Sequence, residues 1–361
     1  MSIGQRIRLA RRAAALSLRG LAEKAGLSAQ AISKYERDLD VPSSRALLRL
    51  AAALGVKVEF FLRPSSEVAI VPAYHRKRSR LTRAEEDSIA ARIQEWLERY
   101  VEIETLTPFG CCARPRFPED LRYRVGRLEE IEDAAENLRM RWNVGLSPIE
   151  NLMEVLEDHG IKVGLVDGYP DFDACTFWAG HDPVIVVRDD VPGDRQRFNL
   201  AHELGHIVLE VDEKESGAPA LSAEAAAHRF AGAFLVPASV VKLELGEQRR
   251  NLGLLELHLL KHKYGLSMQA WVRRAQDTGV LSEAAAVRLF KTFRSRGWHK
   301  AEPGNQLPPE RPSRMRRLAL RAVAEGIISH ARASELLGIS LSDFRKQIAE
   351  EHDGLPADLR H

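Results

Sequence analysis

The sequence predicts a multi-domain, mainly α-helical protein, with an all-α first domain, an α+β domain that contains a small sheet, and a helical C-terminal part. Three observations predict this class. Short stretches between capping serines and glycines fill residues 3–62, apolar residues recur at intervals of three and four elsewhere, and three short apolar runs lie between residues 161 and 187. The first two patterns are typical of helices and the third of strands. The 361 residues suffice for two or three domains.

The composition argues against a membrane segment and against a disulfide framework. Charged residues make up 29% of the chain, and no apolar run approaches the roughly 20 residues of a membrane span. The N-terminus lacks the apolar stretch of a secretory signal. The three cysteines, Cys111, Cys112 and Cys175, are odd in number and form no C-x-x-C pair. We therefore expect a cytoplasmic protein without a membrane partner.

The basic charge of the chain is concentrated at its start. Residues 1–64 contain 12 Lys+Arg and 5 Asp+Glu, a net charge of +7, whereas the remainder has a net charge of −5. Arginines 6, 8, 11 and 12 are expected to cover the polar side of a first helix, whose apolar side is formed by Ile3, Ile7 and Ala10. This asymmetry indicates an anionic partner for the first domain alone.

A short helix, a glycine turn and a second helix with a polar face follow within residues 17–37. Ser17 and Ser28 are predicted N-caps, and Gly26 makes the turn between the helices. Such a helix-turn-helix places its second helix in the major groove of DNA. Ile32 and Tyr35 face inward, which leaves these candidate DNA contacts: Ala29, Gln30, Ser33, Lys34 and Arg37. Gln30 suits an adenine edge, whereas Lys34 and Arg37 suit phosphates.

Two histidines four residues apart, with a glutamate directly after the first, form the sequence His202-Glu203-x-x-His206. On a helix, residues four apart lie on the same face, so both imidazoles can reach one ion. Two neutral imidazoles leave room on zinc for a third protein ligand and a water, whose pKa the metal lowers. Glu203 is then placed to accept a proton from that water. Gly205, inside this helix, indicates a close neighbour, because glycine otherwise weakens a helix.

The third ligand is expected from a second helix. Glu210 lies about 12 Å along the axis from His202 if the first helix continues, which is too far for a shared ion. Residues 222–237 have a helical pattern that Pro237 ends, and Glu224 falls on its apolar side. A carboxylate on an apolar face requires a partner. His228 remains a rival ligand or a neighbour that supports the ligands.

These two segments resemble the ImmA/IrrE family of metallo-endopeptidases. The resemblance covers R-F-N-L-A-H-E-L-G-H at 197–206 and E-x-x-A-H-R-F-A-G-A-F-L-V-P at 224–237. It implies a zincin-like α+β domain with one zinc ion per chain, the ligands His202, His206 and Glu224, and Glu203 as general base. The chain departs from the family at His228, where asparagine is usual, and at Phe234 and Val236.

The resemblance extends to the segments before the zinc helix. A helix over 134–139 and another that Ser147 caps and Pro148 begins are expected, followed by strands at 161–166, 174–178 and 183–187. In such peptidases an edge strand commonly holds the substrate backbone in extended form. The resemblance implies the same arrangement in this chain.

Residues 5–62 resemble the λ-repressor/Cro-like (XRE) family of DNA-binding domains. The motifs that carry this likeness are Arg6-Ile7-Arg8, Leu21-Ala22, the stretch 32–37 and Pro42-Ser43. Leu18 stands where the family often has glutamine, and Gly20 weakens the first helix of the motif. The resemblance implies that the first domain binds an operator in double-stranded DNA.

Four regions are expected along the chain. The first is an XRE-type domain at 1–64. The second, at 65–130, is a linker region that contains a basic run at 74–80 and a helix. The peptidase domain follows at 131–245, and a helical module occupies 246–361. Residues 296–312, which begin R-G-W-x-x-x-E-P, form a turn-rich segment that is also similar to longer family members. Residues 331–339 look like half of a helix-turn-helix without a recognition helix, so the tail from 313 is expected to pack or to bind a partner.

The function expected from these features is that of a DNA-binding regulator with zinc-dependent endopeptidase activity. Its substrate would be a partner repressor that is cleaved in a stress or mobile-element response. DNA binding would raise the effective concentration of the peptidase near a repressor on the same operator. An alternative is a non-catalytic, antitoxin-like regulator with a structural or sensory metal. A third is a peptidase whose first domain docks a protein. A homodimer through the first domain or the C-terminal module is compatible with each. Glu203 favours catalysis, because a structural site needs no such carboxylate and is usually closed by four ligands.

Overall fold

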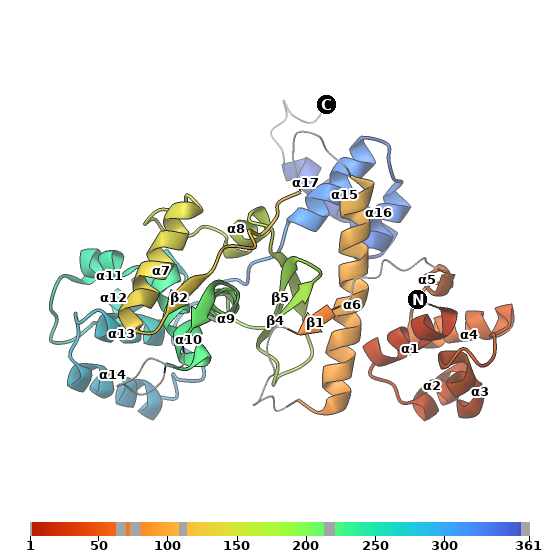
Figure 1. The fold of residues 1–361 in the computed structure, drawn as a ribbon, viewed down its shortest axis with the longest axis horizontal. Helices are drawn as coiled ribbons and strands as arrows, with labels where there is room; N and C mark the ends of the chain where they lie inside the picture. Colours follow the sequence, from red (N-terminus) through yellow and green to blue (C-terminus); the bar gives the residue numbers. More distant parts are fainter. Residues whose placement is uncertain (1, 63–69, 73–80, 108–113, 213–220, 355–361) are drawn as a thin grey trace. The chain divides into compact units, whose positions relative to one another are not determined.

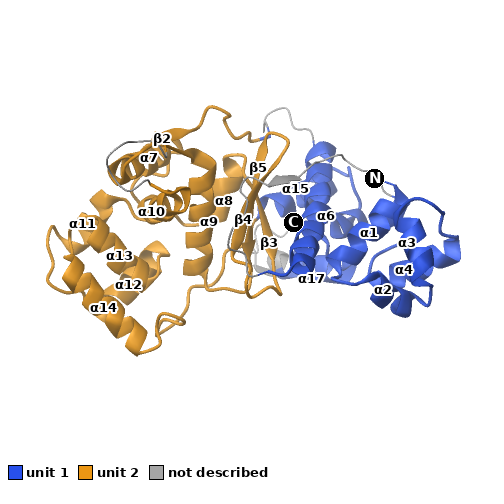
Figure 2. Ribbon diagram, turned by 60° about the horizontal axis from the view of Figure 1, so that its bottom comes forward, with its two compact units in different colours: residues 1–70, 76–114, 313–361 blue, residues 71–75, 115–312 orange. Residues whose placement is uncertain are grey.

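A computed structural model describes residues 2–62, 70–72, 81–107, 114–212 and 221–354 of the chain. The described part is mainly helical and contains two small sheets (Figure 1). It divides into two compact units: unit 1 comprises 1–70, 76–114 and 313–361, and unit 2 comprises 71–75 and 115–312 (Figure 2). The region 246–361, expected as one helical module, is thus shared between the units. No helix among the described residues has the length and apolar character needed to span a bilayer.

The first 62 residues form five helices around one apolar cluster. Ser17 and Ser28 cap their helices as expected, and each accepts a hydrogen bond from the backbone amide three residues on. Gly26 adopts a left-handed conformation with φ of 62°, which glycine allows without strain. Ile32 is fully buried beneath these helices. The helices are α1 (Ile3–Ala13), α2 (Leu18–Ala25), α3 (Ala29–Glu36), α4 (Ser44–Leu54) and α5 (Glu59–Leu62).

The arginines of α1 do not all lie on a solvated face, which corrects the expectation from the sequence. Arg6 is buried, forms an ion pair with Glu98 and lies 5.5 Å from the centre of the Phe60 ring. Arg11 pairs through two nitrogens with Glu36, at 2.6 and 2.8 Å. Because buried charges need partners, these two arginines serve the fold.

Helix α6 (Arg83–Leu106) belongs to unit 1, and other helices of this unit pack against two parts of its length. Near its start, the Ser88 hydroxyl donates to the Ala13 carbonyl at 3.1 Å, which ties α6 to α1. Near its end it packs against α15 (Arg314–Ala324) and α16 (His330–Leu337). Helix α17 (Leu341–Gly354) follows α16 directly. The half helix-turn-helix seen in the sequence is thus followed by a further helix, in which Phe344 and Ile348 give residues 341–354 an apolar side.

Unit 2 contains a sheet with the strand order β1-β4-β5-β3. Strands β4 and β5 are antiparallel, and β3 runs parallel to β5 with Val163 opposite Ile185. The strands are β1 (Ile70–Pro72), β3 (Lys162–Val166), β4 (Ala174–Ala179) and β5 (Asp182–Arg188); the last three confirm the predicted strands. Because β1 pairs with β4, β4 is an inner strand of the described sheet, and β1 and β3 are its edges. A second, parallel pair joins β2 (Tyr123–Val125) to β6 (Leu209–Val211).

The helices of unit 2 surround this sheet and one large apolar core. Helix α9 contacts both β4 and β5 on one side and α10 on the other (Figure 1). The helices are α7 (Leu128–Arg141), α8 (Leu152–Asp158), α9 (Gly193–Val208), α10 (Ala223–Leu235), α11 (Ala238–Leu245), α12 (Leu254–Tyr264), α13 (Met268–Asp277) and α14 (Glu283–Ser295).

The helix expected to begin at Ser147 and Pro148 begins later, at Leu152, with Asn151 as its N-cap. Arg139 explains the shift. Its buried guanidinium donates to the carbonyls of Gly145 and Ser147, both at 2.6 Å, and this holds the preceding residues in a loop.

The turn-rich segment 296–312 is fastened to unit 2 by two glutamates. Glu302 accepts hydrogen bonds from the amides of Met268 and Gln269 at the start of α13. Glu310 accepts from the amides of Leu152 and Met153 at the start of α8. Acidic groups at helix starts satisfy backbone donors that lack helical partners. The segment therefore belongs to unit 2 as an ordered strap.

Two sequence features fall outside the described residues. They are the basic run at 74–80 and the cysteine pair Cys111 and Cys112. Cys175, which is described, lies on β4 and is not part of a disulfide.

Candidate metal centre

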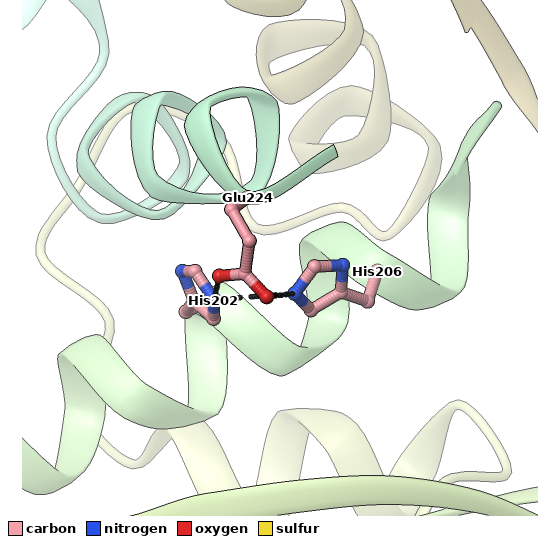
Figure 3. Close-up of side chains that lie close together, drawn as sticks. All are labelled: His202, His206 and Glu224. Carbon is pink, nitrogen blue, oxygen red and sulfur yellow. Dashed lines mark hydrogen bonds and ion pairs between the residues drawn. The ribbon is translucent and has the colours of Figure 1, made fainter. Parts of the chain in front are cut away.

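Helix α9 presents His202 and His206 on one face, and Glu224 reaches them from the first turn of α10 (Figure 3). The Nε2 atoms of the two histidines are 3.2 Å apart. One oxygen of Glu224 lies 3.3 Å from Nε2 of His202, and the other lies 3.6 Å from Nε2 of His206. The three side chains expected to bind a metal are thus brought together, and they form a cluster whose ligand atoms lie within 4.8 Å of one another.

These spacings fit a tetrahedral metal ion. Zinc binds imidazole nitrogen and carboxylate oxygen at about 2.0–2.2 Å, which places neighbouring ligand atoms of a tetrahedron about 3.3–3.6 Å apart. The separations of 3.3 and 3.6 Å, each measured from a different oxygen of Glu224, fall within this range, and the 3.2 Å between the two nitrogens lies just below it. The side chain of His206 is 7% exposed and that of Glu224 is 79% exposed, so the cluster is open to solvent on the Glu224 side. A three-ligand centre with an open side leaves a coordination position for water or substrate.

Both histidines are held in the form that binds metals. Burial, together with the charge of the neighbouring His206, lowers the pKa of His202 to about 4 against the opposing effect of Glu224. Burial also lowers the pKa of His206, again against Glu224. Both rings are therefore neutral at pH 7, and a neutral imidazole has a lone pair for a metal.

Glu203, next to His202 on α9, is held by the sheet. The hydroxyl of Thr176 on β4 donates a hydrogen bond of 2.7 Å to Oε2 of Glu203. Thr176 is buried, so this hydrogen bond is shielded from water and limits the rotation of the carboxylate. The sheet therefore fixes the orientation of the carboxylate that follows the first metal ligand.

Helices α9 and α10 approach closely at Gly205, as the sequence predicts. A Cβ atom at this position would lie 3.0 Å from Cα of Ala227 and 3.2 Å from both Cβ of Ala227 and Cδ1 of Phe230. Ordinary carbon contacts are about 3.5–4.0 Å. Glycine at 205 and alanine at 227 thus set the helix separation that allows Glu224 to reach the histidines.

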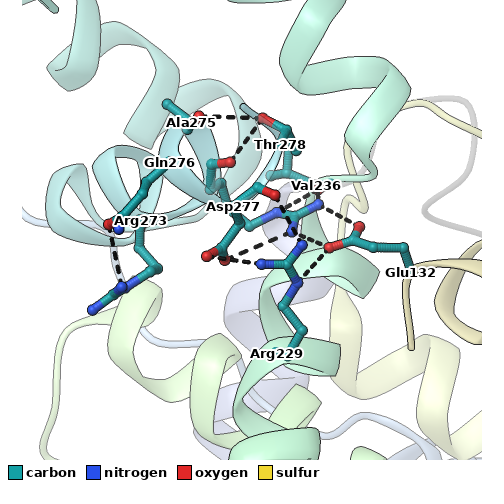
Figure 4. Close-up of polar contacts among 9 residues, drawn as sticks. Glu132, Arg229, Val236, Arg273, Ala275, Gln276, Asp277 and Thr278 are labelled. Carbon is teal, nitrogen blue, oxygen red and sulfur yellow. Dashed lines mark hydrogen bonds and ion pairs between the residues drawn. The ribbon is translucent and has the colours of Figure 1, made fainter. Parts of the chain in front are cut away.

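A cluster of charged residues fixes the orientation of α10 (Figure 4). Its member on α10 is Arg229, five residues after Glu224. Arg229 pairs with Glu132 of α7 at 2.6 Å and with Asp277 at the end of α13 at 2.8 Å. Arg274, which is buried, pairs with the same Glu132 and donates to the Val236 carbonyl. Burial alone would raise the pKa of Glu132, but the two arginines outweigh it and lower the pKa.

Two other residues considered as ligands lie apart from the cluster of three. Helix α9 ends at Val208, one residue earlier than its pattern indicates, and Glu210 lies in β6, where it pairs with Arg124 at 3.3 Å. His228 is exposed one turn after Glu224; its ring lies 4.9 Å from that of Phe198 and 6.4 Å from that of His202. His228 is a neighbour of the centre.

A pocket of about 600 Å³ begins beside His228 and Phe198. Aromatic rings of Phe290 and Trp298 form part of its wall. The cations Arg273 and Lys300 also line it, and both are exposed. The R-G-W-x-x-x-E-P motif thus supplies Trp298 to the pocket and Glu302 to the strap that holds it.

In the first domain, the candidate DNA contacts lie on α3 and at its end. Gln30, Lys34 and Arg37 are exposed, and Ser33 is half-buried. Ala29 is also half-buried and packs against the apolar cluster of the domain. Exposed arginines outside α3, such as Arg19 and Arg45, add positive charge to the domain.

Thr176 and the charged cluster at Arg229 are functional supports that the sequence does not reveal by pattern. Thr176 lies in a strand of alternating burial, where a threonine is ordinary. Arg229, Glu132 and Asp277 are far apart in the chain and carry no shared motif. The signal that could have drawn attention to Arg229 is its position between apolar residues in the middle of the alanine-rich helix α10.

Comparison with known families agrees with the two domains. Residues 7–61 match the helix-turn-helix family model, and residues 156–276 match the model of the IrrE N-terminal-like peptidase domain. The second match contains β3, β4 and β5, the whole of α9 and α10, and all three residues of the cluster. No curated protein matches the chain. The chain therefore joins an XRE-type helix-turn-helix domain to an ImmA/IrrE-like metallopeptidase domain.

Proposed function

We propose that this protein is a DNA-binding transcriptional regulator that also acts as a zinc endopeptidase and cleaves a partner repressor in a stress or mobile-element response. The observation that carries this proposal is the spacing of His202, His206 and Glu224, whose ligand atoms are 3.2–3.6 Å apart on an open face. Glu203 lies in sequence between the two histidines, and β4 holds its carboxylate. One zinc ion per chain fits these three ligands.

The residues of the chain divide the chemistry among them. A bound zinc ion would polarise the carbonyl of the scissile peptide bond and acidify a water molecule. Glu203 would accept the proton of the attacking water and donate it to the leaving amine, and Thr176 would keep its carboxylate in position. His202 and His206, neutral at pH 7, would hold the ion with Glu224.

The pocket beside His228 is suited to a part of the substrate next to the scissile bond. It begins one helical turn from His202, at Phe198. Arg273 lines it, and its guanidinium lies 5.5 Å from the centre of the Phe290 ring and 3.2 Å from the side-chain oxygen of Gln276. Neither Phe290 nor Gln276 carries a charge, and the acidic residue Asp277 in the same lining is paired with Arg229 at 2.8 Å. A substrate segment with a carboxylate would therefore be favoured over one with a basic side chain.

A direct test incubates purified protein with the repressor encoded nearby and identifies the products by mass spectrometry. Wild type is compared with Glu203→Gln at equal zinc content, and Glu210→Gln, which changes an exposed glutamate of β6, is the matched control. We expect cleavage by wild type and by the control and a loss of at least 100-fold in Glu203→Gln. Equal cleavage by Glu203→Gln contradicts the mechanism. No cleavage by any of the three supports the alternative of a non-catalytic regulator with a structural or sensory metal.

A further inference from the structure

Helices α15, α16 and α17 form a three-helix group with a core of its own in unit 1. Its buried residues are Ala319 and Ala322 of α15, Ala333 and Leu336 of α16, and Phe344 of α17. Ile103 of α6 completes this cluster, which is separate from the cluster inside the first 62 residues. The group therefore has the helix number and the separate core that a small helix-turn-helix domain needs.

The turn between α16 and α17 repeats the turn between α2 and α3. Gly26 and Gly338 both end an eight-residue helix in the left-handed conformation, with φ of 62° and 73°. Two residues later, Ser28 and Ser340 cap the next helix, and each accepts a hydrogen bond from the amide three residues on, at 3.1 and 3.0 Å. The spacing from glycine to cap is the same in both turns.

The backbone hydrogen bonds of the two turns also agree. The Leu27 amide donates to the Ala22 carbonyl at 3.1 Å, and the Ile339 amide donates to the Ser334 carbonyl at 3.0 Å. Both bonds span five residues, which closes the end of the first helix in the same way. The direction in which the second helix leaves the turn is set by this local geometry.

Burial follows the same correspondence. Ile32, four residues after the first cap, is fully buried, and Phe344, four residues after the second cap, is 1% exposed. Each is the inward anchor of its helix. The helix α17 consequently turns residues 342, 345 and 346 outward, at the positions that Gln30, Ser33 and Lys34 occupy in α3.

The outward face of α17 is polar, and among residues 341–350 it exposes the cations Arg345 and Lys346 together with the acids Asp343 and Glu350. Ser342, Arg345 and Lys346 are exposed, and Lys346 lies 3.7 Å from Glu350 on the surface. Phe344 and the half-buried Ile348 belong to the core, so the exposed face lacks the large apolar side chains that form the centre of a protein interface. Arginine pairs with guanine edges and lysine with phosphates, whereas a short hydroxyl reaches several bases.

We propose that residues 314–350 form a second DNA-binding helix-turn-helix, in which α17 enters the major groove with Ser342 and Arg345 at base edges and Lys346 at a phosphate. Helix α6 packs against α1 and against both α15 and α16 within unit 1. The two motifs are therefore attached to one helix, and a single chain engages two sites on one duplex. Two linked contacts bind more tightly than either alone.

The test measures binding of the full-length protein to a 30-base-pair duplex of randomised sequence by fluorescence anisotropy, between 50 and 200 mM salt. Arg345→Gln/Lys346→Gln is compared with Gln30→Ala/Lys34→Gln in the first domain. The control is Arg288→Gln/Lys291→Gln, which removes two exposed cations from α14 in unit 2. All substituted residues are exposed, and circular dichroism confirms equal helix content.

We expect the α17 variant to bind more weakly than wild type and to lose about threefold less affinity over this salt range, as expected when one phosphate contact, that of Lys346, is absent. The control behaves as wild type. Binding by the α17 variant that equals the control at every salt concentration overturns the proposal and favours a protein partner for this face.

A second measurement locates the contact. A sequence selected from the random pool is examined by hydroxyl-radical footprinting. Wild type is expected to protect two stretches, of which the α17 variant loses one and the first-domain variant loses the other. Protection of the same stretches by wild type and by the α17 variant overturns the proposal independently of any change in affinity.

Discussion

Gly205→Ala tests whether the close approach of α9 and α10 sets the metal centre. The added Cβ would lie 3.0–3.2 Å from atoms of Ala227 and Phe230, against about 3.5–4.0 Å for ordinary carbon contacts. The helices must then separate by about 0.3–1 Å locally. Metal sites tolerate deviations of only about 0.2 Å in ligand distances. Glu224, on α10, would be displaced from the two histidines of α9.

Two effects on stability oppose each other in this variant. Overpacking a close contact costs about 1–3 kcal/mol. Replacing glycine by alanine inside a helix contributes about 1 kcal/mol in favour of folding. We therefore expect a small net loss of stability, about 0–2 kcal/mol, together with a loss of zinc affinity of about tenfold or more, the scale seen when support around a metal site is disturbed.

The assay combines zinc titration against a competing chelator dye with urea unfolding of the zinc-free protein. Gly20→Ala is the matched control, because Gly20 also lies inside a helix. A Cβ atom added at Gly20 would have Ser17 Oγ as its nearest neighbour, at an ordinary contact distance of 3.4 Å. The control should gain up to about 1 kcal/mol of stability and keep wild-type zinc affinity. Wild-type zinc affinity in Gly205→Ala would refute the reasoning.

Three further predictions concern the supports of the centre. Thr176→Val removes the hydrogen bond to Glu203, so kcat should fall about tenfold or more while KM and zinc content stay unchanged; a rise in KM alone would contradict the positioning role. Glu132→Gln leaves Arg229 and Arg274 without their shared carboxylate and should lower the free energy of unfolding by about 3 kcal/mol at pH 7. Because the arginines lower the pKa of Glu132, its contribution is present above pH 4.5 and lost as the pH falls below it, so the acid dependence of stability should be shallower in the variant. Arg273→Gln should reduce cleavage of substrates with acidic residues near the scissile bond several-fold, whereas Arg294→Gln, outside the pocket, should not; an equal effect of both variants would contradict a role for the pocket.

The parts predicted from the sequence are those set by local spacing. His202 and His206 share a face because they are four residues apart on α9, and Ser17, Gly26 and Ser28 mark a turn by their residue types alone. Glu224 was singled out as an acidic residue on an apolar helix face, but its side chain is 79% exposed; its position in the first turn of α10, beside the two histidines, brings it to the cluster.

The parts that were missed depend on contacts between distant segments. Thr176 reaches Glu203 because β4 lies against α9, and no pattern in either segment encodes that contact. Arg6 looked like a surface residue until Glu98 of α6 supplied its partner. The sequence of α17 did not indicate a recognition helix, because its apolar pattern depends mainly on Phe344 and Ile348 and its start depends on the turn at Gly338.

The central claim is that His202, His206 and Glu224 form one open metal centre. X-ray absorption at the zinc edge, on protein loaded with one equivalent of zinc, tests it most directly. We predict two imidazole nitrogens with oxygen ligands at about 2.0–2.2 Å and no sulfur, with zinc affinity lost in Glu224→Gln but kept in Glu203→Gln. A sulfur ligand, a third imidazole, or equal zinc affinity in Glu224→Gln and wild type would contradict the account.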